Sequence, residues 1–236
     1  MHHLNVPLLP HLRQDSPMQL VSSELDKLAP ERIENTPWSA HENGTIASFA
    51  MAHNNACIFL KYYVTEQAIQ AKYRNTNDPV YKDTCVELFI AFEGETAYYN
   101  LEFNCLGTCL AEFGSDRQTR RLLPAETIAK IRRMASLRAG HENAPLKTWQ
   151  LTLVIPTDVF SEHALAKLEA TQVRANFYKC GDELPIPHYM TWTAVEAPAP
   201  DFHLPEYFGR INFMEAPYHP TEHSTGLCFS SASKTL

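Results

Sequence analysis

The chain has 236 residues, with 27 acidic and 20 basic side chains that give a formal net charge of -7. This length suits one large β-domain or two small ones, and we expect a single domain. The acidic balance provides no basic surface for phosphate groups, so we expect no nucleic acid partner. No apolar run approaches the length of a membrane span, so we expect no membrane partner either. The sequence does not indicate which oligomeric state the protein adopts.

The N-terminal segment, residues 1–34, is expected to be an arm packed on the domain. Its prolines favour an extended arm or an edge strand over residues 1–17. Residues 20–28 have a weak helical pattern that ends before Pro30. The segment lacks the basic region and apolar run of a signal peptide. As written, the chain is therefore expected to be cytoplasmic, and extracellular or periplasmic if its start has been trimmed.

The centre of the domain is a hairpin whose two strands alternate between apolar and polar side chains. Val86, Leu88 and Ile90 fall on one face of the first strand, and Leu101 and Phe103 fall on the corresponding face of the second. A period of two is typical of a strand with one face in the core. The opposite face is rich in polar groups, so we expect a wet face where function should be sought.

Further short strands precede and follow this hairpin, separated by turn residues. Expected strands cover residues 46–52, 57–64, 69–74, 108–113, 149–155, 172–180, 188–193 and 209–214. A short helix is expected to start at Pro124, and residues 160–168 are expected to form a short helix or a turn. The pattern predicts an all-β fold, an antiparallel β-sandwich of immunoglobulin-like or jelly-roll-like type with one or two short peripheral helices. The domain should span residues 35–214, and residues 215–236 should form a loose tail.

The polar face carries the ingredients of a sugar site. Aromatic rings pack against the C–H faces of a sugar, and planar polar groups bind its hydroxyls. Each such residue alone is more often a plain surface or core residue, but the set is suggestive. The candidate ligand-binding residues are Tyr81, Glu87, Asn100, Asn104, Arg174, Asn176, Tyr189 and Trp192.

Several segments together resemble one known family. They are YKDTCVELFI from Tyr81, YYNLEFNCLGT from Tyr98, NFYKCGDE from Asn176, HYMTW from His188 and PDFHLPEYFGRINF from Pro200. The set resembles the family 9 carbohydrate-binding modules, specifically their stand-alone family-9-like group, over residues 35–214. The resemblance implies a non-catalytic β-sandwich that holds the end of a sugar chain, a mono- or oligosaccharide, between two aromatic rings.

The resemblance also suggests roles for particular residues. In the xylanase-attached modules one tryptophan stands six residues before a sugar-contacting glutamate, and Tyr81 and Glu87 have that spacing here. Trp192 matches the second ring. The arginine contact of the family has no secure equivalent, and Arg74, Arg117 and Arg174 are candidates by composition alone. Structural calcium is possible by resemblance, but no DxDxDG-like loop occurs, so we assign no calcium ligand and expect no other cofactor or metal.

Two other functions stay open at this point. A sugar-active enzyme would hydrolyse glycosides with a carboxylate pair on the same sheet face, either Glu87 with Glu102 or Asp83 with Glu87. Signatures such as GxSxG, GxGxxG and HExxH are missing, and we assign no catalytic residue. A haem module would need axial ligands such as methionine and histidine. The candidates in this chain are Met51, Met190 and His188.

Histidines and cysteines outside these sets have plainer expected roles. His203 lies between two prolines and is expected to pin its loop by hydrogen bonds to backbone. His219 and His223 fall in the tail and are expected to be exposed. The six cysteines form no CxxC pair, so buried free thiols are expected rather than disulfides or a zinc site. They are Cys57, Cys85, Cys105, Cys109, Cys180 and Cys228.

Overall fold

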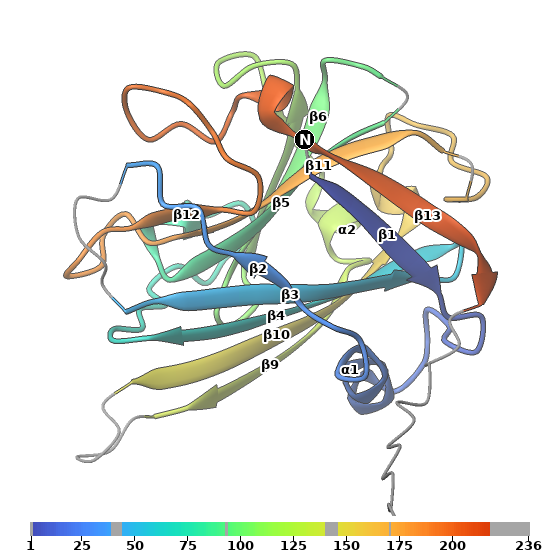
Figure 1. The fold of residues 1–236 in the computed structure, drawn as a ribbon, viewed down its shortest axis with the longest axis horizontal. Helices are drawn as coiled ribbons and strands as arrows, with labels where there is room; N and C mark the ends of the chain where they lie inside the picture. Colours follow the sequence, from blue (N-terminus) through green and yellow to red (C-terminus); the bar gives the residue numbers. More distant parts are fainter. Residues whose placement is uncertain (1, 39–43, 93, 140–145, 170, 218–236) are drawn as a thin grey trace, which may run out of the picture.

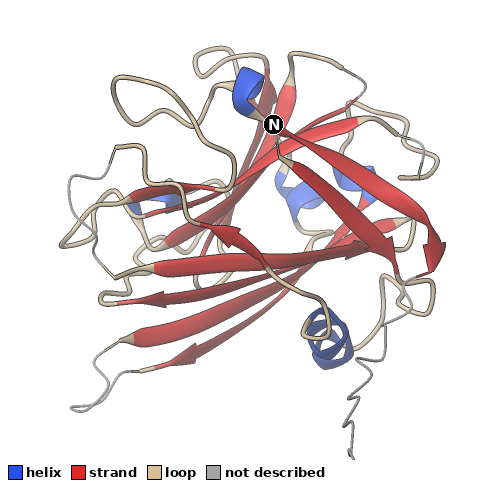
Figure 2. Cartoon of the chain, viewed as in Figure 1, coloured by secondary structure: helices blue, strands red, loops and turns tan. Residues whose placement is uncertain are grey.

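A computed structural model describes residues 2–38, 44–92, 94–139, 146–169 and 171–217. Within these residues the chain is mostly β-structure with two short α-helices (Figures 1 and 2). Its strands join in one 13-stranded sheet, in the order β8-β7-β6-β5-β11-β13-β1-β3-β4-β10-β9, with β12 beside β11 and β2 beside β3. The tail residues 218–236, which include His219, His223 and Cys228, lie outside the described residues.

The strands have the following bounds: β1 (His3–Leu8), β2 (Glu31–Ile33), β3 (Ile46–His53), β4 (Cys57–Glu66), β5 (Cys85–Phe92), β6 (Tyr98–Asn104), β7 (Cys109–Gly114), β8 (Arg121–Leu122), β9 (Arg132–Arg138), β10 (Lys147–Pro156), β11 (Val173–Cys180), β12 (Tyr189–Thr191) and β13 (Gly209–Pro217). The α-helices are α1 (Met18–Leu25) and α2 (Ala125–Ile128). None of the helices in the described residues is long and apolar enough to cross a membrane.

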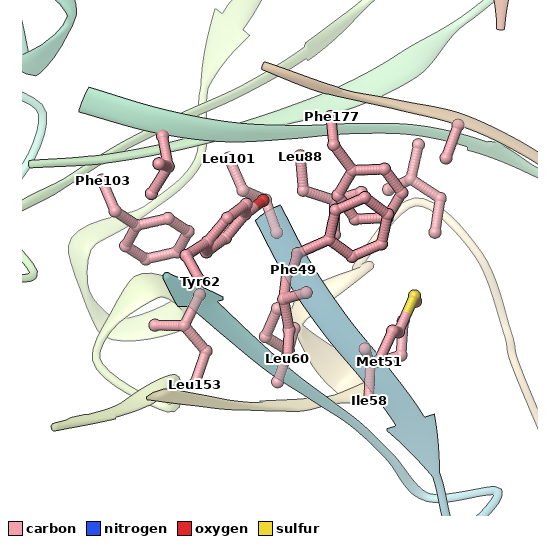
Figure 3. Close-up of a cluster of buried hydrophobic side chains, with 14 of the residues drawn as sticks. Phe49, Met51, Ile58, Leu60, Tyr62, Leu88, Leu101, Phe103, Leu153 and Phe177 are labelled. Atoms are coloured by element: carbon pink, nitrogen blue, oxygen red, sulfur yellow. The ribbon is translucent and has the colours of Figure 1, made fainter. Parts of the chain in front are cut away.

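The sheet is strongly curled, so that its two halves pack face to face around the main core. Phe49 and Tyr62, from β3 and β4, point toward Leu88 and Phe177, from β5 and β11 (Figure 3). The rings of Phe49 and Phe177 are stacked with centroids 3.6 Å apart. The alternation that predicted the hairpin β5–β6 therefore identified the core-facing residues correctly.

The predicted antiparallel sandwich is wrong in two respects, because the strands form one curled sheet instead of two separate sheets, and because β1 is parallel to both of its neighbours. It pairs with β13 along most of its length and with β3 at Leu8. The predicted N-terminal arm thus contributes a strand inside the sheet and joins the two halves. The mostly β class is confirmed, and so are short helices at residues 18–25 and 125–128, whereas residues 160–168 form turns and no helix.

The expected wet face of the hairpin is also buried. Glu87, Asn100, Glu102 and Asn104 are all at most 3% exposed. Phe202 and Phe208, from the segment after β12, pack over this face in a second hydrophobic cluster. Sequence periodicity gives the two faces of a strand but does not show that a distant loop covers one of them.

Two segments differ in secondary structure from the prediction. Residues 69–74 form no strand, because the buried Asp83 carboxylate accepts the backbone N–H groups of Lys72 and Tyr73 and holds them in a loop. Residues 132–138, for which no strand was predicted, form the edge strand β9 beside β10.

Candidate functional site

A pocket of about 180 Å³ opens on the side of β5, β6, β7 and β11 that faces away from the main core. Loops from residues 115–120 and 200–203 form part of its wall. The pocket combines aromatic rings with acidic and basic groups. Its lining residues are Tyr81, Glu87, Glu102, Leu110, Glu112, Arg117, Arg120, Cys180, Asp182, Tyr189, Pro200, Asp201, Phe202 and His203.

The floor of the pocket is set by strand register. Glu87 on β5 lies directly opposite Glu102 on β6, and residues directly opposite in an antiparallel pair share a face. Cys180 on β11 completes this floor, where its thiol donates to Glu87 Oε1 at 3.0 Å. Asn100 Nδ2 donates to Glu102 Oε1 at 2.8 Å, whereas Glu102 Oε2 has no hydrogen-bond partner among the described residues.

Burial holds both floor carboxyl groups toward their neutral form. It raises the pKa of Glu87 well above its usual range, and the neighbouring Cys180 and Glu102 add to this effect. Burial likewise raises the pKa of Glu102 to about 8, helped by Glu112 and opposed by Arg120. The pocket floor can therefore donate a proton as well as accept a hydrogen bond.

One wall of the pocket is a charged network around Arg120. Its guanidinium binds Glu112 Oε2 through Nε at 3.0 Å and Nη2 at 2.9 Å, a charge-assisted contact. The same side chain contacts the His203 ring, and Tyr98 Oη lies 3.0 Å from His203 Nδ1. Burial, with Arg120 and Arg117 beside the ring, lowers the pKa of His203 to about 3. The contacts of the His203 ring are therefore with side chains of this network, whereas the sequence predicted hydrogen bonds to backbone.

Aromatic side chains supply the apolar part of the pocket. Phe202 stacks on Tyr178 with ring centroids 4.1 Å apart, and Tyr189 meets Phe202 edge-on at 6.2 Å. Tyr81 and Tyr189 are half-buried, so part of each ring faces solvent or the pocket. The backbone N–H of Asp182 donates to the Tyr81 carbonyl at 3.2 Å, which holds the loop after β11 beside Tyr81.

Three of the predicted site residues meet in this pocket: Tyr81, Glu87 and Tyr189. Trp192 does not line it, and the predicted pairing of Tyr81 with Trp192 is not formed. Trp192 is 1% exposed and packs edge-on against Phe177 in the main core, where its Nε1 donates to Glu31. Tyr189 and Trp192 stand three residues apart, and an odd spacing places side chains on opposite faces of an extended chain.

The other four predicted residues are engaged elsewhere in the fold. Asn100 binds the carboxylates of Glu102 and Glu112, and Asn104 Nδ2 donates to Asp83. Arg174 donates to the carbonyls of Pro205 and Glu95. Asn176 Oδ1 accepts the backbone N–H of Thr193 at 2.9 Å. These contacts position strands and loops around the pocket, and none of the four side chains lines it.

Sequence reasoning did not assign most of the pocket wall. Of the three candidates for an arginine contact, Arg117 lines the pocket. The unassigned residues are Leu110, Glu112, Arg120, Cys180, Asp182, Pro200, Asp201, Phe202 and His203. Alternation along β7 places Glu112 on the face of Glu102, which is a usable signal. The proline-rich loop that carries Phe202 and His203 offers no comparable pattern.

The side chains present show whether calcium or haem could be bound. Calcium takes six to eight oxygen ligands. Among the described residues, the group of metal-ligating side chains that lie together is Cys85, Glu87 and Cys180, a donor set that does not suit calcium. Met51 and Met190 pack in the main core, and His188 Nε2 contacts Lys179 Nζ, so the structure does not gather these three around a haem.

Comparison with known proteins now identifies the family. The family model described as carbohydrate-binding family 9 matches residues 18–213. The chain belongs to this family. A family 9 assignment agrees with the resemblance found in the sequence, and it extends that resemblance toward the N-terminus to include α1. The comparison with curated proteins finds no match.

Solved structures support the fold of this family 9 protein. A protein from Bacteroides uniformis, described as a candidate carbohydrate-binding protein, is 31% identical with a TM-score of 0.82, covering 90% of this chain and 99% of that chain. A family 9 module from Caldicellulosiruptor kristjanssonii, solved with glucose, has a TM-score of 0.50 at 10% identity over 93% of this chain and 100% of that chain. A family 9 module from the same organism, solved with cellotriose, has a TM-score of 0.50 at 9% identity. This match covers 93% of this chain and 100% of that chain. These last two show similarity of fold alone.

Proposed function

We propose that this family 9 protein binds one sugar residue, free or at the end of an oligosaccharide, in the pocket beside Tyr81. The observation that carries the proposal is a pocket in which the rings of Tyr81, Tyr189 and Phe202 occur with carboxyl and guanidinium groups. Aromatic faces suit the C–H faces of a sugar, and planar charged groups suit pairs of hydroxyls. The glucose and cellotriose complexes of the Caldicellulosiruptor module make glucose-containing sugars the first ligands to test.

The size of the pocket favours one ring over a chain. Sites for drug-sized ligands occupy roughly 300–1,000 Å³, whereas this pocket encloses about 180 Å³. A sugar end would enter the pocket while any following residues remain outside it. We therefore expect monosaccharides and the ends of longer oligosaccharides to bind with similar affinity.

Calorimetric titration with glucose, cellotriose and a panel of other monosaccharides tests the proposal. Tyr189→Ala should lower affinity by about fivefold or more, since stacking on an aromatic ring contributes on the order of 1 kcal/mol. Tyr63→Ala is the matched control, because Tyr63 is also half-buried but lies on β4, in the other half of the sheet. Its hydroxyl donates to Asp26 there. Equal affinities in both variants, or no sugar binding by the folded wild type, would contradict the proposal.

A second candidate function is glycoside hydrolysis at the same pocket. The observation that favours it is the pair Glu87 and Glu102, opposed in register, buried, and both with raised pKa values. Directly opposed side chains have Cβ atoms about 4.5–5.5 Å apart, near the carboxyl separation of retaining glycosidases. Release of nitrophenol from nitrophenyl glycosides tests this function. Turnover that Glu87→Gln abolishes would support it, and absence of turnover with intact sugar binding would exclude it.

A further inference from the structure

Three metal-binding side chains from two strands meet at the floor of the pocket. Cys85 and Glu87 stand two residues apart on β5 and therefore share a face. Cys180 on β11 lies directly opposite Cys85. The two Sγ atoms and a carboxylate oxygen of Glu87 all lie within 4.8 Å of one another. This arrangement results from sheet register and involves residues far apart in the sequence, which is why cysteine spacing gave no sign of it.

We propose that Cys85, Glu87 and Cys180 form a zinc site at the floor of the pocket. Zinc binds thiolate sulfur at about 2.3 Å and carboxylate oxygen at about 2.0–2.2 Å. In a tetrahedral site these lengths place neighbouring ligand atoms roughly 3.3–3.8 Å apart. Ligand atoms already within 4.8 Å of one another reach this geometry through small side-chain rotations. Two thiolates also favour zinc over calcium or magnesium, which prefer oxygen ligands.

The environment of Glu102 gives a second indication of a missing cation. This residue lies opposite Glu87, is 3% exposed, and lines the same pocket. Its Oε2 atom has no hydrogen-bond partner within the part of the chain that the structure describes, although buried polar atoms normally have one. A metal ion at Glu87, or a water bound to that ion, would supply a partner on this side of the floor.

Access from the pocket distinguishes this cluster from ordinary buried thiols. A buried cysteine usually acts as a small hydrophobic residue, and Cys109 is an example on the core side of β7. Cys85 and Cys180 also belong to a hydrophobic cluster, but Glu87 and Cys180 line the pocket, and Cys85 is directly opposite Cys180. Three protein ligands at the floor would leave the fourth coordination position of zinc directed toward the pocket, as in open zinc sites. The inference goes beyond sugar binding and does not require it.

Cobalt titration of the wild-type protein tests the site without any substitution. The purified protein would be stripped with a chelator under reducing conditions and titrated with Co²⁺. We expect one equivalent to bind with the intense near-ultraviolet absorption of thiolate-to-cobalt charge transfer, and Zn²⁺ should abolish this absorption. A folded protein that shows no such band would overturn the proposal. A disulfide between Cys85 and Cys180, detected as the loss of two free thiols in protein purified without reductant, would overturn it as well.

Variants then test which residues bind the ion. Loss of a partner outside the ligand shell already lowers zinc affinity by about 10–100-fold. Cys180→Ser and Glu87→Gln should therefore lower Zn²⁺ affinity by more than about 100-fold in competition with a chromophoric chelator. Cys109→Ser, which replaces a buried thiol outside the cluster, should bind as the wild type does. Circular dichroism checks folding, and Glu87→Gln decides the matter if Cys180→Ser does not fold. Equal affinity in Glu87→Gln and Cys109→Ser would contradict the assignment.

Discussion

Glu87 and Glu102 face each other across β5 and β6, and both carboxyl groups are buried in the pocket floor. Two acids in such a place lower stability, because an ionised carboxylate loses its hydration when it is buried. A hydrophobic pair at these positions would pack on Leu110 and Cys180 without this penalty. The pair is thus a feature of the pocket that folding alone does not require.

Replacement of Glu102 by Gln should stabilise the protein at alkaline pH. Folding raises the pKa of Glu102 from 4.5 to about 8. Between these values the folded state binds the proton and the unfolded state does not, so stability falls as the pH rises through this window. Gln cannot ionise, and its amide oxygen can still accept from Asn100. We expect Glu102→Gln to exceed the wild type by roughly 2 kcal/mol at pH 8, measured by urea unfolding.

The control for this prediction is Glu126→Gln on α2, because Glu126 is exposed. Its free energy of unfolding should follow that of the wild type across the same pH range. If Glu102→Gln is less stable than the wild type at every pH, ionisation of Glu102 does not limit stability.

Replacement of Trp192 by Ala should lower the stability of the fold, whether or not it affects sugar binding. The ring is buried and packs edge-on against both Phe49 and Phe177, and a Cβ atom added at Gly209 would approach Trp192 to 2.5 Å, so this part of the core is tightly packed. Truncation of a buried aromatic residue costs about 3–5 kcal/mol. Denaturant unfolding should show a loss of this size, whereas half-buried Tyr189→Ala should lose less. A stable Trp192→Ala protein that binds no sugar would instead support a direct contact between Trp192 and the ligand.

The sequence predicted most strands of the sheet because their core faces alternate cleanly. Val86, Leu88 and Ile90 on β5 all lie in the main core, as their spacing of two indicates. Strand β9 was missed because residues 132–138 alternate poorly and are largely exposed at an edge. Likewise, the parallel pairing of β1 depends on contacts with residues near the other end of the chain, and local patterns do not carry that information.

The site could be predicted only in part. The spacing of Tyr81 and Glu87, and the position of Tyr189 after a short loop, led to three residues that the structure brings together. Phe202 and His203 could not be placed, because a loop of irregular structure carries them over the sheet from a distant point in the sequence. The period-two rule, applied to β12, would have separated Trp192 from Tyr189.

Asp83 should stabilise the loop of residues 69–74, for which the sequence predicted a strand. Its carboxylate is buried and accepts from the N–H groups of Lys72 and Tyr73 and from Asn104 Nδ2, at 2.9–3.0 Å. Loss of this acceptor removes one buried and two partly buried hydrogen bonds, at about 1–3 kcal/mol for each donor that water does not reach. We expect Asp83→Ala to lower the free energy of unfolding by about 3 kcal/mol or more, measured with urea.

The matched control for Asp83 is Asp78→Ala. Asp78 also accepts two backbone N–H groups, from Arg74 and Asn75, but these hydrogen bonds are exposed to water. Water can replace the lost acceptor there, so the loss should be about 1 kcal/mol or less. Equal losses in the two variants would show that burial of Asp83 does not determine its contribution.

His188 should control stability in mildly acidic solution. The ring is 5% exposed, and its Nε2 accepts from Lys179 Nζ at 2.8 Å. Burial, with Lys179 beside the ring, lowers the pKa of His188 from 6.5 to about 4. Between these values the unfolded state binds the proton and the folded state does not. Stability is therefore fully present above about pH 6.5 and is lost as the pH falls to about 4, by up to roughly 3 kcal/mol.

Substitution of His188 by Gln tests this linkage, because an amide can keep a hydrogen bond to Lys179 without titrating. The free energy of unfolding of His188→Gln should change less between pH 6.5 and pH 4 than that of the wild type. The exposed His3 on β1 provides the control, and His3→Gln should retain the full wild-type dependence. An unchanged slope in His188→Gln would assign the acid sensitivity to other groups, of which the half-buried His203 is the first to test, since its pKa is also lowered.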